Sequence, residues 1–126
     1  MATRSRIAVK QQDGTIDSIY CHFDGYPSGV GDVLINYYSR KEADQLMQGG
    51  DISTLGDDPE HCKKYQDAGR KYLDLNSFFE DLGNRGEEYG YILMDDSQWY
   101  CIPVVGDGVG ELQLVTKVLS ERGGIS

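Results

Sequence analysis

The sequence lacks the features that mark several large classes of protein. Its 126 residues contain no apolar run approaching the length of a membrane span, and the first residues lack the apolar core of a signal peptide. Basic residues are scarce, with 12 Lys and Arg against 21 Asp and Glu, so the formal net charge is -9. This balance argues against broad contact with DNA, RNA or anionic membrane, which takes clustered basic side chains. We expect a cytosolic protein.

Cysteine and histidine are also scarce. Three cysteines in a chain without a signal peptide argue against a disulfide framework and predict free thiols. The pairs Cys21-His22 and His61-Cys62 do not have the spacing of a zinc finger, and neighbours on a strand point to opposite faces. No catalytic triad or Cys-His signature stands out. We therefore expect no metal, no cofactor and no enzymatic activity.

The residues that are present suit one globular domain covering 1–126, with 39% hydrophobic residues to form its core. Alternating apolar positions predict strands over residues 6–11 and 15–23, joined by a turn at Asp13-Gly14. A second hairpin is predicted from residues 89–94 and 99–105, where Pro103 is typical of an edge strand.

Helical spacing of apolar residues predicts helices between and after these hairpins. Ser28 is the predicted cap of a helix to Tyr38, Ser39 and Glu42 form a predicted capping box, and Asn76 is the predicted cap of a third helix. Residues 112–119 are compatible with a last helix or with a strand. The polar residues 56–70 indicate an exposed loop or insertion. The order ββαα-αββα predicts an α+β fold, an antiparallel sheet of two hairpins with helices packed on one face.

The segment from Tyr20 to Gly31 is the best candidate for a binding site. It leads from a strand through a glycine- and tyrosine-rich turn to a helix start, where backbone N–H groups can approach an anion. The alternative is a purely structural turn, which Asp32 favours because its charge already complements the helix dipole. On the binding interpretation, the ligand would be held by Tyr20, His22, Asp24, Tyr26, Gly29 and Gly31, with charge from Arg4 and Arg6.

Aromatic residues are a second signal. Nine tyrosines and Trp99 are many for this length, and such side chains favour interfaces because they bury a large area and keep a polar tip. We expect a homo-oligomer, with the ligand near a subunit interface.

The phrases Thr3-Arg4-Ser5-Arg6-Ile7 and Ser18-Ile19-Tyr20-Cys21-His22-Phe23-Asp24-Gly25-Tyr26-Pro27-Ser28, with the Asp13-Gly14 turn between them, resemble a family of small bacteriophage proteins. The segment from Gly50 to Gly56 is similar to a later block of that family, so the resemblance covers roughly the first half of the chain. It brings no catalytic residues.

The resemblance implies an accessory protein of the host bacterial cytoplasm that counteracts antiviral defence. Proteins of this kind include sponges for nucleotide second messengers, such as the cyclic ADP-ribose isomers of Thoeris defence, and acidic inhibitors of nucleases or CRISPR complexes. We expect a nucleotide-binding sponge. The alternatives are an acidic inhibitor that occupies the nucleic-acid groove of a host protein and, third, a small hydrolase.

Overall fold

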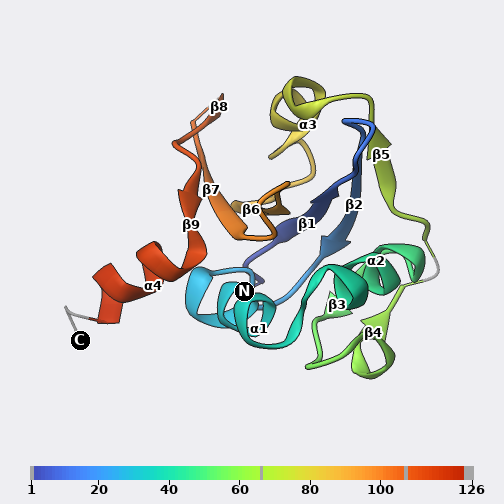
Figure 1. The fold of residues 1–126 in the computed structure, drawn as a ribbon. Helices are drawn as coiled ribbons and strands as arrows, with labels where there is room; N and C mark the ends of the chain where they lie inside the picture. Colours follow the sequence, from blue (N-terminus) through green and yellow to red (C-terminus); the bar gives the residue numbers. More distant parts are fainter. Residues whose placement is uncertain (1, 66, 107, 124–126) are drawn as a thin grey trace.

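The computed structural model describes residues 2–65, 67–106 and 108–123 of the chain (Figure 1). Within these residues, four α-helices and nine strands make up an α+β fold, which confirms the predicted class. In chain order the elements are β1 (Ser5–Lys10), β2 (Ile16–Cys21), a π-helical turn (Pro27–Gly31), α1 (Asp32–Tyr37), α2 (Arg40–Gln48), β3 (Ile52–Thr54), a 3-10 turn (Pro59–His61), β4 (Lys63–Lys64), β5 (Arg70–Tyr72), α3 (Leu75–Asp81), β6 (Tyr89–Leu93), β7 (Trp99–Val105), β8 (Gly108–Val109), β9 (Gln113–Leu114) and α4 (Val115–Gly123).

The sheet is mixed, so the prediction of an antiparallel sheet was wrong. Its main path runs β4-β3-β2-β1-β6-β7-β8, with β5 paired to β2 and β9 paired to β7. Strand β1 is antiparallel to β2 but parallel to β6, and β2 is parallel to β3. The chain between β2 and β6 is long enough to cross over the sheet, which allows β6 to enter beside β1 in the same direction.

Helices cover both faces of the sheet, and not one face as the pattern predicted. Ile7 and Val9 on β1 pack into a cluster with residues of α1, α2 and α4, whereas Ala8 packs with Phe78 of α3 on the opposite face. Figure 1 shows α3 on the far side of the sheet from α1 and α2. A central strand buried on both faces takes apolar residues at successive positions, as β1 does.

Two predicted helix caps were also wrong. The first helical segment begins as a π-helical turn at Pro27 and has no side-chain cap, so Ser28 lies inside the turn. Helix α3 is capped by Asp74, whose carboxylate accepts a 2.8 Å hydrogen bond from the Ser77 N–H, while Asn76 lies within the helix. Asp74 has the extended backbone that a cap adopts, and this places its oxygen at the first helical turn.

Residues 56–70 contain the 3-10 turn, β4 and the start of β5. Strand β5 lies very close to β2, since a Cβ added at Gly69 would come within 2.2 Å of the Ser18 carbonyl oxygen. Its pairing partners on β2 are Ile16, Asp17 and Ser18. The last segment, open between helix and strand in the sequence, forms β9 followed by α4. Within the described ranges, none of the helices has the length and apolar character that crossing a membrane takes.

Candidate functional site

The glycine turn after β2 uses its main-chain N–H groups internally. The Gly29 N–H donates to the Tyr26 carbonyl at 2.9 Å, and the Val30 N–H donates to the Asp24 carbonyl at 2.8 Å. Two of the N–H groups that were expected to face an anion are therefore occupied. Both acceptors belong to the same turn, so the segment satisfies these N–H groups internally.

The eight residues expected to bind a ligand do not converge on one place. Arg6 and Tyr20 line one pocket, while Asp24, Tyr26 and Gly29 line a separate hollow on the other side of the turn. His22 bonds to Tyr20, and Arg4 donates from Nη1 to the Arg85 carbonyl at 3.3 Å. Gly31 is packed: a Cβ there would contact Val115 at 3.1 Å and Tyr91 at 3.3 Å.

The first of these cavities, which we call the basic pocket, has a volume of about 460 Å³. Four of the eight residues that line it are cationic, although the chain as a whole is strongly acidic. They come from β1, from β5 and from the loop after α3, three segments that the fold brings to one place. The lining residues are Arg6, Tyr20, Asp51, Ala68, Gly69, Arg70, Lys71 and Arg85.

Two of the cations are held in place by hydrogen bonds to acidic and hydroxyl side chains. Arg6 is only 2% exposed; its Nε donates to Glu87 Oε2 at 2.8 Å and its Nη1 to the Ser18 hydroxyl at 3.0 Å. Arg85 Nη1 donates to Asp81 Oδ2 at 2.8 Å. Such bonds fix a guanidinium plane before any ligand arrives, which lowers the entropy lost on binding.

The other two cations are held loosely. Arg70 Nε lies 3.9 Å from Asp81 and its side chain is 51% exposed; Lys71 Nζ lies 3.8 Å from Asp17 and its side chain is 65% exposed. Both separations are longer than a hydrogen bond, and exposed pairs of this kind contribute little to stability. Arg70 can therefore turn towards an anion at small cost, whereas Lys71 is directed to Asp17.

A tyrosine and a carboxylate complete the wall. The Tyr20 N–H donates to Asp51 Oδ1 at 2.8 Å, which ties the end of β2 to the start of β3. Burial raises the pKa of the Asp51 carboxyl, because loss of water disfavours the charged form. Burial also raises the pKa of the Tyr20 hydroxyl above its ordinary value of 10.0. That hydroxyl shares a 2.8 Å hydrogen bond with His22 Nδ1.

Aromatic rings extend from the basic pocket across the neighbouring surface. The Tyr20 ring stacks on Tyr65 with centroids 6.5 Å apart and planes inclined by 26°. His22 meets Tyr65 edge-on at 6.5 Å and Phe23 edge-on at 4.6 Å. Tyr65 is 39% exposed, which leaves ring surface open beside a cationic cavity.

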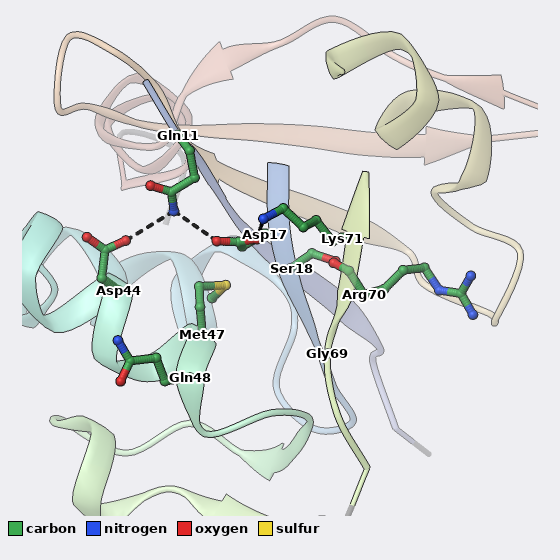
Figure 2. A pocket seen from close by; sticks show the side chains of 9 residues that line it. All are labelled: Gln11, Asp17, Ser18, Asp44, Met47, Gln48, Gly69, Arg70 and Lys71. Carbon is green, nitrogen blue, oxygen red and sulfur yellow. Dashed lines mark hydrogen bonds and ion pairs between the residues drawn. The ribbon is translucent and has the colours of Figure 1, made fainter. Parts of the chain in front are cut away.

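A second cavity of about 490 Å³ lies on the α2 side of β5 (Figure 2). Here the Gln11 amide donates to Asp17 at 3.0 Å and to Asp44 at 3.3 Å, so both carboxylates share one neutral donor. Figure 2 shows Lys71 reaching towards Asp17, whereas the Arg70 side chain points away from Asp44 and Gln11. Strand β5 thus separates this cavity from the basic pocket, to which Gly69, Arg70 and Lys71 also belong.

The chain matches no protein family model, no curated protein sequence and no solved structure. Its own geometry is therefore what identifies a site. Within the described ranges, no three His, Cys, Asp or Glu side chains are grouped so that they could hold a metal ion.

Sequence reasoning found Arg6 and Tyr20 but missed Arg70, Lys71 and Arg85. Arg70 ends the segment 56–70 that was interpreted as an exposed loop or insertion, Lys71 follows it, and Arg85 lies in the turn that closes α3. The basic pair at 70–71 is a sequence signal, but similar pairs occur at 40–41 and 63–64, and no such pair includes Arg85. The convergence of Arg70 and Lys71 on Arg6 depends on β5 pairing with β2, which the polar sequence of β5 does not predict.

Proposed function

We propose that this protein is a non-enzymatic binder of an anionic, nucleotide-type ligand, which it sequesters from a host defence system. The observation that carries the proposal is the basic pocket, where four of the chain's 12 Lys and Arg residues line one cavity. Small-molecule sites usually fall within about 300–1,000 Å³, and the pocket's volume of about 460 Å³ suits a mononucleotide.

The way in which the cations are held supports an anionic ligand. Arg6 and Arg85 are held in place by Glu87, Ser18 and Asp81, and they contribute positive charge to the cavity wall. Arg70, whose side chain is 51% exposed, stands at the rim and can close over the ligand. The rings of Tyr20 and Tyr65 lie beside the pocket, where a base can stack on an aromatic face.

The biological setting rests on the resemblance of the N-terminal half to small bacteriophage proteins. A sponge binds its signal without converting it, so the site needs affinity and no reactive group. The residues that line the pocket offer guanidinium, ammonium and ring surfaces beside the Asp51 carboxylate.

Calorimetric titration with a panel of mononucleotides, cyclic nucleotides and ADP-ribose tests the proposal. We expect at least one of these probes to bind and to raise the melting temperature, because a ligand of the native state stabilises it by mass action. Arg70→Gln should weaken that binding by about tenfold or more, since a charge-assisted hydrogen bond is worth ~1.5–3 kcal/mol.

Lys117→Gln is the matched control, because Lys117 is an exposed cation on α4, away from the pocket. Equal losses in the two variants would mean that only net charge matters, which would contradict a defined site. Chromatography of the recovered probe gives a second readout: a hydrolysed nucleotide would contradict the non-enzymatic assignment.

A further inference from the structure

The turn after β2 lines a further cavity, which is separate from the basic pocket and from the cavity beside α2. This cavity, here called the Phe23 hollow, has a volume of about 170 Å³. It lies between the turn, the start of α1 and the loop after β3. Its lining residues are Phe23, Asp24, Tyr26, Ser28, Gly29, Val30, Asp32, Val33 and Leu55.

Two carboxylates in this hollow have neutral partners only. Tyr26 Oη donates to Asp24 Oδ1 at 3.2 Å, and Asn36 Nδ2 donates to Asp32 Oδ1 at 3.1 Å. Among the described parts of the chain, no Lys, Arg or His side chain forms an ion pair with Asp24 or Asp32. The hollow therefore presents two positioned negative charges without a compensating cation.

Exposed rings stand beside these carboxylates. Phe23 is 44% exposed and Tyr26 is 39% exposed, and both line the hollow. Tyr37, one helical turn after Val33 on α1, is 53% exposed. The face of an aromatic ring attracts a cation electrostatically, and the attraction grows when the cation is partly desolvated.

Gly29, which lines the hollow, has no room for a side chain of its own. A Cβ at Gly29 would come within 2.4 Å of the Asp24 carbonyl oxygen and within 2.9 Å of Tyr26 Cε2. Val30, Val33 and Leu55 supply apolar surface, which suits the methylene stem of a long basic side chain. Rings, carboxylates and apolar floor together match a side chain with an apolar stem and a cationic tip.

We propose that the Phe23 hollow binds an arginine or lysine side chain presented by a basic protein partner. The hollow is smaller than the usual range for small-molecule sites, about 300–1,000 Å³, so it takes one side chain and not a whole metabolite. The net charge of -9 would steer a basic partner towards this surface, and exposed tyrosine and phenylalanine are typical of the contact area around such an anchor. This inference is independent of the anion site.

The test is an NMR titration of isotopically labelled protein with a capped pentapeptide that has one arginine among glycines. The same peptide with norleucine in place of arginine is the neutral control probe. We expect saturable shifts at residues 23–33 and 55 with the arginine peptide, in the millimolar range of Kd, and none with the norleucine peptide.

Variants locate the interaction. Asp24→Asn and Asp32→Asn should each weaken binding several-fold, whereas Glu121→Gln, which removes an exposed charge on α4, should leave it unchanged. Asp24 has φ 60°, a left-handed conformation that asparagine tolerates well, so Asp24→Asn should keep the fold.

Three results would overturn the proposal. The first is an arginine peptide that causes no saturable shift, and the second is binding that survives both aspartate substitutions. The third is a dimer, detected by analytical ultracentrifugation, that Asp24→Asn dissociates; it would assign the hollow to a second copy of this chain.

Discussion

The basic pocket and the Phe23 hollow differ in how the protein compensates their charges. In the basic pocket each cation faces a carboxylate, from Arg6 with Glu87 to Lys71 with Asp17. In the Phe23 hollow, Asp24 and Asp32 have only neutral donors. Compensated charges keep a folded cavity stable in the absence of a ligand, and a ligand must then compete with the internal partners. Uncompensated charges on the surface remain solvated and attract a partner over a longer range.

The largest expected effect comes from breaking the buried pair beneath the basic pocket. Glu87→Gln keeps an amide oxygen for the N–H groups of Gly83 and Arg85 but removes the charge that faces Arg6. The glutamate side chain is 0% exposed and that of Arg6 is 2% exposed, so the arginine would be left as an unpaired buried cation. We expect a loss of ~3 kcal/mol in the free energy of unfolding, measured by urea denaturation.

Asp24→Asn is the comparison for that measurement, since it removes a charge from the Phe23 hollow. Because Asp24 faces no cation in the described chain, its unfolding midpoint should stay close to that of the parent protein. A midpoint for Glu87→Gln that is also unchanged would mean that burial of the Arg6 pair carries no energetic weight.

Replacing Gly69 or Gly29 by alanine should affect one cavity at a time, with a loss of stability of intermediate size. Gly69→Ala would push β5 from β2, and Gly29→Ala would force the turn open, because each new Cβ would clash with a carbonyl oxygen, at 2.2 Å and 2.4 Å respectively. We expect each to cost ~1–3 kcal/mol in stability. Gly69→Ala should impair nucleotide binding alone and Gly29→Ala arginine-peptide binding alone.

Gly108→Ala is the control for both, since no atom lies within 4 Å of a Cβ added there. For the three variants, calorimetry measures nucleotide binding and NMR measures binding of the arginine peptide. If either clashing variant lost both activities, the two cavities would behave as one site, and the comparison between them would fail.

The smallest expected effect is a gain of affinity. Asp81 faces both Arg70 and Arg85, so Asp81→Asn should free two cations and strengthen anion binding by about threefold to tenfold, as removal of a nearby unit charge is worth ~1 kcal/mol. The measurement is calorimetric titration with the mononucleotide that binds the parent chain. Weaker binding in this variant would show that Asp81 orients the arginines and does not compete with the ligand.

The stability of Asp81→Asn should also differ from that of the parent protein in its dependence on pH. Burial acts to raise the pKa of Asp81, but hydrogen bonds from Tyr72, Arg85 and Asn84 outweigh it and hold that pKa well below the ordinary value of 3.8. The stabilisation from this carboxylate is therefore present above that ordinary value and is lost as the pH falls below it. The measurement is the urea midpoint of the parent protein and of Asp81→Asn at several pH values above and below 3.8. The difference between the two midpoints should shrink as the pH falls.

Local pattern was enough to predict the principal elements of the fold. The alternation of Ile7 and Val9 predicted β1, the apolar spacing around Leu34 predicted the helix that contains α1, and the pattern of Ser39 and Glu42 predicted α2. Alternation gives the two faces of a strand but does not name its neighbours, so the parallel pairing of β1 with β6 was not predicted. Strand β5 shows only one buried residue, Tyr72, and a polar strand of this kind leaves no periodic signal.

Local pattern likewise predicted only part of the candidate site. Its residues on β1 and β2 belong to a predicted hairpin, so Arg6 and Tyr20 could be singled out. Those from β5 and the loop after α3 reach the pocket only through tertiary packing. The turn after β2 was singled out as a place where backbone N–H groups could meet an anion. In the structure a side chain at Gly29 would clash with the Asp24 carbonyl oxygen, and the N–H groups of Gly29 and Val30 donate to carbonyls within the turn.

The central position of β1 has a consequence for synthesis of the chain. The Arg6 to Glu87 bond spans 81 residues, and β1 gains its second neighbour only when β6 has left the ribosome. Until then one edge of an almost wholly buried strand has no partner. Contacts between distant segments slow folding, and an open strand edge favours association between nascent chains. Pulse-labelled nascent chains should therefore acquire protease resistance only after residues 89–93 have emerged.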